Sequence, residues 1–274
     1  MREITSASNP MIKAFRRALK EGVTREGWLA IEGPLLIQEA LSAAGDGREK
    51  RGAACRCVIR SVLAARTAAR KFADLLARMP SGAEIAETPD IIFSRIAATA
   101  SPQGIAALIE VETPDLERIF RLPNAMIAVV DGLQDPGNLG TILRSAEAFS
   151  ADALVTLKST VSPYNPKILR ASGGAVFRMP VFPAFEREAF YSRLRPAGLR
   201  LVAADPHSRR SIGEADLSGP VAILIGSEAA GLPAGIPSAD RVAIPLRPEI
   251  DSLNAAVAAG IFLYECARQR GFRY

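Results

Sequence analysis

The fold that the chain is expected to adopt is decided by one stretch, Asp131-Gly-Leu-Gln-Asp-Pro-Gly-Asn-Leu-Gly-Thr-Ile-Leu-Arg-Ser-Ala146. It follows the apolar run 125–130, which has the length and composition of a buried strand. After a turn at 135–137 the chain enters a helix, and Asn138 is the expected N-cap because Asn readily accepts the open amide groups of a first turn. A strand that turns directly into a helix is typical of an α/β domain.

Arg144 is the candidate functional residue in this helix. Helical side chains lean toward the N-terminus, so its guanidinium is expected to project back over Gly140, where no side chain blocks it. The positive end of the helix dipole faces the same space, and the two together suit a phosphate or another anion. The stretch therefore predicts a binding site as well as a strand–helix junction.

The composition limits the class of protein. The 274 residues suffice for two domains or one large one, and 34 Lys and Arg against 29 Asp and Glu give a formal charge of +5. A basic balance favours a nucleic-acid partner, although many basic enzymes have none. The three cysteines and the single histidine, His207, are too few and too unevenly spaced for a disulfide framework or a metal site.

The sequence also bears on where the protein is found. Its first residues lack the apolar core of a signal peptide, and no apolar run approaches membrane-spanning length. With so few cysteines, reduced thiols are the expected state. We therefore expect a cytoplasmic protein that does not associate with a membrane.

Residues 1–111 are expected to form a separate small α/β domain. Strand-like segments alternate with helix-like ones, with strands at 28–32, 57–60 and 104–111 and helices at 9–19, 35–41, 64–78 and 89–97. The first helix has an apolar face and a basic one, and the basic face carries Lys13, Arg16 and Arg17. That face is either an ordinary solvated surface or an edge that contacts phosphates, and the pattern leaves both open. No nucleophile or phosphate loop stands out here, which favours a binding module.

After a connector at 112–122, residues 123–274 are expected to form a second α/β domain. Its further strands are expected at 153–157, 175–181, 199–204, 221–225 and 241–246, and its further helices at 167–172, 183–194 and 252–265. Alternation with short connections implies a mostly parallel sheet covered on both faces. Ligands bind such sheets outside the carboxyl ends of the strands.

Two further segments follow strands of this sheet. In Ile225-Gly-Ser-Glu-Ala-Ala-Gly-Leu232, Gly226 and Gly231 permit turns and close backbone approach, and Glu228 places a carboxylate at the strand end. Taken alone, this segment is equally well explained as a structural turn.

The second of these segments opens the last helix. Ser252 is expected near the N-cap, and Ser252 and Asn254 place polar groups at the helix entrance. The helix also carries an apolar stripe that is expected to pack in the core, with a subunit contact as an additional use: Leu253, Val257, Ile261 and Tyr264.

Together, the stretches 138–146, 225–232 and 244–260 resemble the three signature motifs of the SpoU (TrmH-like) family of the SPOUT superfamily, whose members are RNA ribose 2′-O-methyltransferases. Each motif alone is weak, but the ordered triple covers the whole second domain. Residues 28–41, Trp-Leu-Ala-Ile-Glu-Gly-Pro-Leu-Leu-Ile-Gln-Glu-Ala-Leu, resemble the ribosomal-protein-like substrate-binding domain of that family.

The resemblance implies a parallel sheet whose C-terminal part forms a deep trefoil knot, S-adenosylmethionine as cofactor, and a homodimer. It assigns the catalytic site to Asn138, Arg144, Glu228, Ser252 and Asn254. Backbone groups would hold the cofactor at Gly226, Ile244, Leu246 and Leu253. The family usually has Met and then Gly after Ile244-Pro245, whereas this chain has Leu246 and Pro248, and Pro248 removes an amide donor.

The role of Arg144 follows from its chemistry. The family residue at this position is sometimes described as a general base, but an Arg with a side-chain pKa above about 12 is a poor base and a good bidentate phosphate ligand. Our hypothesis is that Arg144 orients the target phosphate and stabilises the developing alkoxide, while the other four residues position the ribose or relay its proton. His207 lies outside all three motifs and is a poor candidate for the base.

Several functions compete at this stage. The leading one is methylation of a ribose 2′-hydroxyl in structured RNA, with ribosomal RNA favoured over transfer RNA and with Lys13, Arg16, Arg17 and Arg144 as RNA contacts. From another class, the chain could be an RNA-binding factor that keeps the fold without catalysis. A nicotinamide-dependent oxidoreductase or an ordinary Rossmann-type methyltransferase is disfavoured, because no G-x-G-x-x-G follows the relevant strand.

Overall fold

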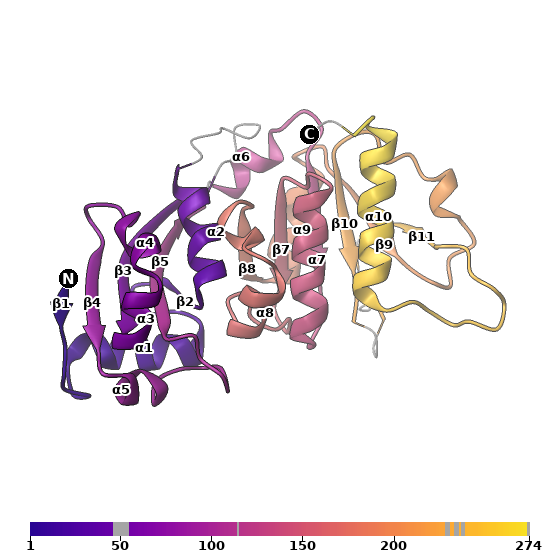
Figure 1. The fold of residues 1–274 in the computed structure, drawn as a ribbon. Coiled ribbons are helices and arrows are strands. Elements are labelled where there is room, and N and C mark those ends of the chain that lie inside the picture. Colours follow the sequence, from indigo (N-terminus) through magenta and orange to yellow (C-terminus); the bar gives the residue numbers. More distant parts are fainter. Residues whose placement is uncertain (46–54, 114, 228–230, 233–235, 237–238, 273–274) are drawn as a thin grey trace. The chain divides into compact units, whose positions relative to one another are not determined.

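The structure of the chain, a computed structural model, describes residues 1–45, 55–113, 115–227, 231–232, 236 and 239–272. Two compact units divide it (Figure 1). The first comprises Met1–Glu49, Cys55–Glu112 and Tyr164–Arg178, and the second comprises Thr113–Pro163 and Met179–Tyr274. None of the described helices is long and apolar enough to cross a membrane.

The first unit is built on a five-stranded mixed sheet in the order β1-β4-β3-β5-β2. Its strands are β1 (Arg2–Glu3), β2 (Leu29–Glu32), β3 (Arg56–Ala65), β4 (Glu84–Thr88) and β5 (Ile105–Glu112). Strand β4 pairs in parallel with β1 and β3, whereas β5 is antiparallel to β3 and β2. The alternation of strands and helices predicted for this part of the chain is confirmed, with the short strands β1 and β4 as additions.

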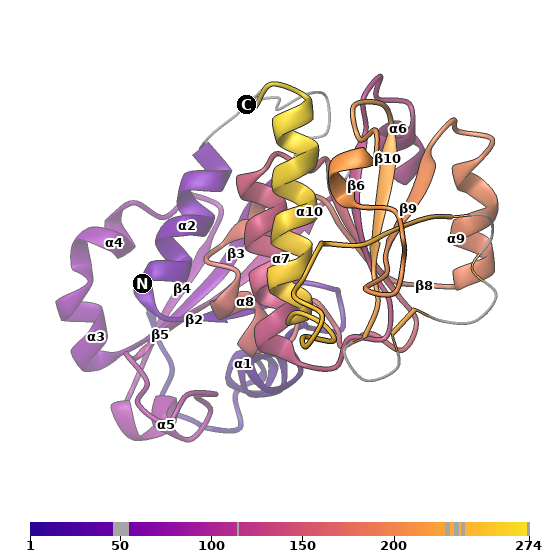
Figure 2. The same cartoon turned by 90° about the vertical axis from the view of Figure 1, so that its right-hand side faces the viewer.

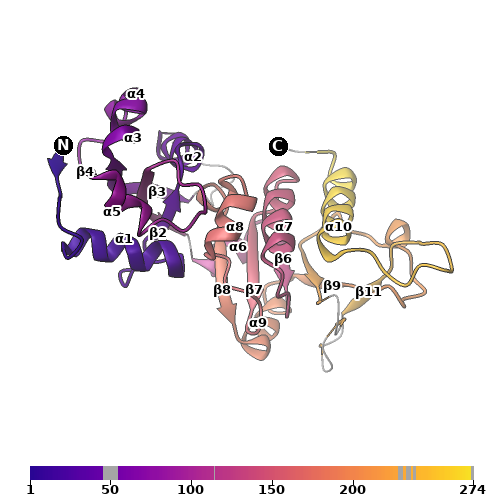
Figure 3. The ribbon, with the colours of Figure 1, turned by 60° about the horizontal axis from the view of Figure 1, so that its bottom comes forward.

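The first unit also contains helices, several of which pack on this sheet. They are α1 (Pro10–Glu21), α2 (Pro34–Gly45), α3 (Arg66–Lys71), α4 (Ala73–Ala77), α5 (Asp90–Ser94), α8 (Pro166–Ala171) and the 3₁₀ helix η1 (Ala175–Phe177). Figure 3 shows α1 lying along the sheet, and its apolar residues Ile12, Phe15 and Leu19 are almost fully buried. The predicted single helix over 64–78 is wrong, because β3 continues to Ala65 and the helical part is interrupted at Phe72.

Residues 164–178 belong to the first unit, although they lie between two strands of the second unit in sequence. Helix α8 packs on α1 and β2. A Cβ at Gly22, which ends α1 with φ of +90°, would lie 1.8 Å from the Tyr164 carbonyl oxygen. Only glycine therefore permits this close approach.

The second unit contains a six-stranded sheet in which every pair is parallel, in the order β11-β9-β10-β6-β7-β8. Its strands are β6 (Met126–Val130), β7 (Ala153–Leu157), β8 (Val181–Phe185), β9 (Arg200–Ala204), β10 (Val221–Ile225) and β11 (Asp240–Val242). All residues of β6, β7 and β10 are buried, which is the pattern of strands covered on both faces. The predicted parallel sheet is confirmed.

Helices cover both faces of this sheet (Figure 2). The long helices α7 (Pro136–Ala148) and α10 (Ala255–Gln269) pack against each other on one face. Helices α6 (Leu116–Phe120) and α9 (Arg187–Leu194) contribute to one apolar core with the other face, and a 3₁₀ helix, η2 (Ile212–Glu214), follows β9.

Several local predictions for this unit are wrong. The segment predicted as a strand at 175–181 is the 3₁₀ helix η1, and β8 follows it where a helix from 183 was expected. The expected connector 112–122 contains α6, whose apolar side chains are buried in the core of the second unit. Each error lies where short apolar runs do not distinguish a strand from a helix.

The buried face of α10 also differs from the predicted apolar stripe. Val257 and Tyr264 are 52% and 45% exposed. The residues buried on this helix are instead Ala255, Ala256, Ala259, Phe262, Leu263, Cys266 and Ala267. Small side chains on this face let α10 approach α7, and a Cβ at Gly260 would lie 3.9 Å from Ser145 Oγ.

Candidate active site

The carboxyl ends of β6, β9, β10 and β11 lie at one edge of the sheet, because these strands are parallel. Helices α7 and α10 begin at this edge. Asp135 caps α7, since its Oδ2 accepts the amide of Asn138 at 2.7 Å. Asn254 caps α10, since its Oδ1 accepts the amides of Ala256 and Val257 at 2.9 and 3.3 Å. The predicted N-caps Asn138 and Ser252 are therefore wrong by three and two residues, respectively.

A pocket opens at this edge between the strand ends and the start of α10. Its lining includes all four positions proposed to hold a cofactor and one proposed catalytic residue: Gly226, Ile244, Leu246, Leu253 and Ser252. Strand β11 ends at Val242, and the chain then leaves the sheet, so residues predicted as strand at 244–246 line the pocket instead.

The pocket is lined mainly by apolar residues, which suits a ligand with a mainly apolar ring system. Apolar side chains such as Ile225, Leu232 and Phe262 line it, with polar groups at only a few points. A Cβ at Gly226 would lie 2.4 Å from the Gly231 carbonyl oxygen, so glycine is needed for the chain to close on itself beside the pocket. Such a lining fits the adenosine part of a nucleoside cofactor.

The side chains of Asn138 and Asn254 meet at the entrances of the two helices. Asn254 Nδ2 donates to Asn138 Oδ1 at 2.9 Å. Because Asn254 Oδ1 already caps α10, its amide orientation is fixed, and that of Asn138 follows from it. The two helices that begin at this edge are thus joined by one hydrogen bond between candidate site residues.

Arg144 lies elsewhere on α7. It is six residues beyond Asn138, roughly 9 Å along the helix axis, and it does not line the pocket. Its side chain is exposed and forms no ion pair within the described part of the chain. An exposed guanidinium without a carboxylate partner is available to an anion that comes from outside.

The remaining candidates lie apart from the pocket. Glu228 lies outside the described residues. Lys13, Arg16 and Arg17 are exposed on α1 in the first unit, and Arg17 Nε pairs with Glu21 Oε2 at 2.8 Å. No group of three or more His, Cys, Asp or Glu in the described ranges is arranged to hold a metal ion.

Two charged groups at this edge escaped the sequence reasoning. Asp131, the first residue after β6, is almost fully buried, and Arg187 holds both of its carboxylate oxygens at 2.7 Å. This hydrogen bond raises the pKa of Arg187. The amide of Asp131 donates to the Ile225 carbonyl at 3.0 Å, so the same residue joins the loop before α7 to the loop that starts at Gly226. The feature of the sequence that could have identified Asp131 is its position directly after a buried strand.

The second is Asp205, the first residue after β9, which lines the pocket. Its carboxylate accepts the His207 amide at 2.9 Å and pairs with Arg241 at 2.9 Å. His207 itself is exposed and does not line the pocket, so the geometry gives it no role as a base.

A doubly covered parallel α/β sheet with a pocket at its carboxyl edge defines a ligand-binding class of fold, and comparison with known proteins narrows this class. Residues 125–264 match the SpoU rRNA Methylase family. The 23S rRNA (guanosine(2553)-2′-O)-methyltransferase RlmP of Bacillus subtilis is 28% identical over 96% of this chain and 98% of its own length. The 23S rRNA (uridine(2479)-2′-O)-methyltransferase of Streptomyces viridochromogenes is 34% identical over 73% of this chain and 72% of its own length.

Among solved structures, the AdoMet-bound rRNA methyltransferase of Sinorhizobium meliloti has a TM-score of 0.78, with 29% identity and 97% of both chains covered. The likeness thus extends over both units as well as over the matched domain. The chain belongs to the SpoU rRNA methylase family.

Proposed function

We propose that this protein transfers a methyl group from S-adenosylmethionine to a ribose 2′-hydroxyl of ribosomal RNA. The observation that carries the proposal is that one pocket, at the carboxyl edge of the sheet, is lined by all four positions that the family resemblance assigns to the cofactor. The named relatives that methylate 23S rRNA support the choice of substrate.

The pocket residues would hold the cofactor mainly through their backbone. Gly226, Ile244, Leu246 and Leu253, which line the pocket together with Ser252, would surround the adenosine. S-adenosylmethionine, when bound, supplies an electrophilic methyl group. Pro248, which lies beside this wall in sequence, offers no amide, so the contacts near it must come from carbonyl groups or neighbouring amides.

The polar residues at the helix entrances would handle the ribose. Asn254 Nδ2 donates to Asn138 Oδ1, which fixes the orientation of the Asn138 amide at the helix entrance where the ribose would be held. Arg144 would bind the phosphate of the target nucleotide and stabilise negative charge on the attacking oxygen, since a guanidinium is a strong bidentate anion ligand and a poor base. Glu228 is the carboxylate that we propose as a proton relay.

The first unit would bind the structured RNA around the target. Lys13, Arg16 and Arg17 project from one exposed helix face, as expected of a surface that contacts phosphates. We propose that substrate binding and catalysis are divided between the two units, near 1–111 and 123–274 as the sequence predicts, except that residues 164–178 join the first unit and α6 joins the second.

The protein would act as a homodimer through the second unit. Val257 and Tyr264 are exposed on α10, and Tyr264 packs edge-on to Phe149 with ring centroids 5.7 Å apart, so an apolar strip runs along the paired helices. A second copy would cover this strip. We also propose the trefoil knot of the family for the C-terminal part of the chain and a cytoplasmic location.

A decisive experiment maps ribose methylation in total RNA from cells with and without the gene. Loss of one 2′-O-methyl site in ribosomal RNA is the expected result, and a lost site in transfer RNA would move the substrate to that class. If no site is lost and the purified protein does not bind S-adenosylmethionine in calorimetry, the proposal is wrong and a non-catalytic RNA-binding role replaces it.

Sedimentation of the wild type and of Val257→Asp tests the dimer.

A further inference from the structure

The pocket contains one charged side chain that the three motifs do not include. Of the described residues that line it, only Asp205 is charged, and Ser227 and Ser252 are the other side chains with polar atoms. Asp205 lies at the carboxyl end of β9, between the partner strands β10 and β11. It lines the same pocket as Gly226 and Ser227, which follow β10, and as Leu246 and Leu253, which precede α10.

The carboxylate is held in a fixed position. Its side chain is only 12% exposed. Its own amide donates to the Val242 carbonyl at 2.9 Å, its Oδ1 accepts the His207 amide, and its Oδ2 accepts from Arg241, each at 2.9 Å. Each carboxylate oxygen can accept two hydrogen bonds, so both retain acceptor capacity after these contacts.

The group is also ionised at neutral pH. Burial disfavours the charged form, but the hydrogen bonds from Arg241 and from the His207 amide outweigh it and lower the pKa of Asp205. A charged acceptor in a mostly apolar slot binds N–H and O–H donors more strongly than the same group does in water.

The segment after β9 is also held in place by hydrogen bonds that do not involve the Asp205 carboxylate. Ser208 Oγ donates to the Arg241 carbonyl at 2.7 Å, Ala243 donates to the Arg210 carbonyl at 2.8 Å, and Ile212 donates to the Ala243 carbonyl at 2.8 Å. These bonds tie the segment after β9 to the segment around β11. The Asp205 carboxylate is therefore not needed solely to hold this segment in place.

We propose that Asp205 is a cofactor-recognition residue, whose carboxylate accepts hydrogen bonds from a donor group of S-adenosylmethionine. The donors of that molecule are the two ribose hydroxyls, the α-ammonium group and the adenine amine. This inference rests on the proposed function, because it assumes the nature of the ligand.

Calorimetry on the full-length protein tests the inference through affinity rather than turnover. Asp205→Asn keeps the size of the side chain and one acceptor oxygen but removes the charge, and we expect its affinity for S-adenosylmethionine to fall roughly tenfold or more. The matched control is Asp216→Asn, which removes the same charge from an exposed carboxylate that does not line the pocket, and its affinity should stay within about threefold of the wild type. The same titrations with 5′-methylthioadenosine, which lacks the amino-acid part, locate the donor: a retained penalty points to the adenosine, and a lost penalty points to the ammonium.

Two outcomes overturn the inference: an affinity of Asp205→Asn within about twofold of the wild type, or equal losses in Asp205→Asn and Asp216→Asn, which would make the loss an effect of net charge. If Asp205→Asn does not fold, the wild type is titrated with adenosine, with its analogue lacking the two ribose hydroxyls, and with analogues of S-adenosylmethionine lacking the ammonium or the adenine amine. Unchanged affinity for all of these would equally contradict it. Failure of the wild type to bind S-adenosylmethionine at all would instead refute the proposed function.

Discussion

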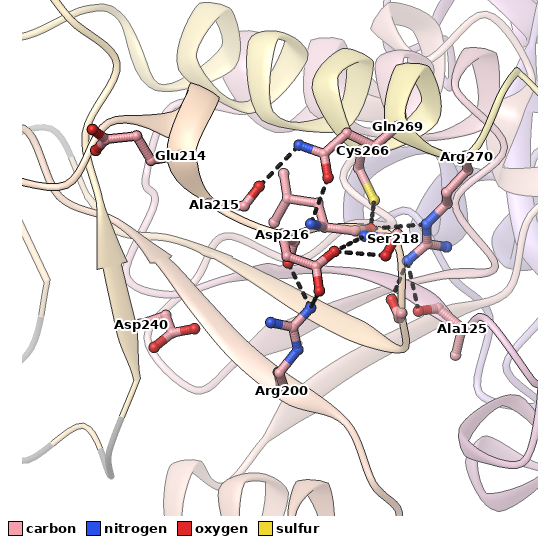
Figure 4. A network of polar contacts seen from close by, with 12 residues as sticks. Ala125, Arg200, Glu214, Ala215, Asp216, Ser218, Asp240, Cys266, Gln269 and Arg270 are labelled. Atoms are coloured by element: carbon pink, nitrogen blue, oxygen red, sulfur yellow. Dashed lines mark hydrogen bonds and ion pairs between the residues drawn. The ribbon is translucent and has the colours of Figure 1, made fainter.

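The two edges of the sheet in the second unit use their polar side chains differently. At the carboxyl edge, polar groups such as Asp205 and Ser252 line a pocket, and Asn138 and Asn254 bond to each other at the helix entrances. At the amino edge, polar side chains from the end of α10 bond to backbone groups (Figure 4).

The amino edge is held by the last turn of α10. The Arg270 guanidinium donates to the carbonyls of Asn124, Ala125, Leu217 and Gly219. Gln269 donates to the Ala215 carbonyl at 2.9 Å and accepts the Leu217 amide at 2.7 Å. Cys266 Sγ contacts the Leu217 carbonyl at 3.3 Å, and burial raises the pKa of this thiol to about 11.

A hollow also lies at the amino edge, and three of the polar side chains that line it, those of Asp152, Gln269 and Arg270, bond to backbone groups. Asp152, which lines it, accepts the Met126 amide at 2.8 Å, and Gln269 and Arg270 bond as described. Backbone groups left without partners are costly, so the amino edge is organised for stability. The carboxyl edge, where side chains line a pocket or project outward, is organised for binding. Substitutions at the two edges should therefore change different quantities.

The largest effect is expected at Arg144. Arg144→Lys keeps the charge but loses the bidentate geometry, and the methylation rate should fall on the order of 10²-fold or more. Because the side chain is exposed and has no ion pair in the described part of the chain, the melting temperature should not change. Arg193→Lys, an exposed arginine of α9, is the control. A near-normal single-turnover rate for Arg144→Lys would contradict the orientation role.

At the amino edge, Arg270→Met should lower the free energy of unfolding by about 2–3 kcal/mol, because several carbonyls lose a charged donor. Urea denaturation measures this, with the affinity for S-adenosylmethionine unchanged. Arg268→Met is the matched control on the same helix, since among the described residues Arg268 pairs only with the neighbouring Glu265, and it should cost about 0.5 kcal/mol or less. Equal losses in the two variants would remove the contrast between the edges.

Substitutions of the two residues joined by the hydrogen bond between the helix entrances should have different effects. Asn254→Asp still caps α10 but cannot donate to Asn138, and the two oxygens would repel, so the rate should fall roughly tenfold. Asn138→Asp keeps the acceptor for Asn254 and should retain this contact, while the side chain loses its Nδ2 donor and gains a charge. Because Asn254 lies between Leu253 and Ala255, which line the pocket, Asn254→Asp should lower the affinity for S-adenosylmethionine as well as the methylation rate. Asn138→Asp should lower the methylation rate alone. The reverse pattern in calorimetry and kinetics would show that the amides are oriented the other way.

The smallest effect concerns the ion pair of Asp205 with Arg241. The pKa of Asp205 is lower in the folded chain, so this stabilisation is present above the ordinary Asp pKa of about 4 and is lost as the pH falls through the folded value. Arg241→Met should cost about 0.5 kcal/mol at pH 7 and less at pH 3, since Arg241 is half exposed. The pH dependence of this cost should vanish in the Asp205→Asn background, as measured by denaturation at both pH values. A cost that is the same at both pH values would mean that the pair does not contribute.

The sequence alone predicted a large part of the second unit. The apolar runs at 153–157 and 221–225 match β7 and β10 residue for residue, because strands buried on both faces leave little room for polar residues. It also predicted positions that converge on one pocket, since parallel strands place their carboxyl ends at one edge. Helix starts were less predictable: Asp135, Asn138, Ser252 and Asn254 are all good caps, and only the path of the turn selects among them.

What the sequence determined by itself was the main alternation of strands and helices and the segments that reach the site, because period, apolar runs and motif spacing are local properties. The tertiary structure decided which face of α10 is buried, since that helix is apolar on more than one side and only packing against α7 and the sheet selects one. It also paired Asp131 with Arg187 and Asp205 with Arg241, which are 56 and 36 residues apart. Contacts over such separations depend on how the sheet is assembled, and no local pattern encodes them.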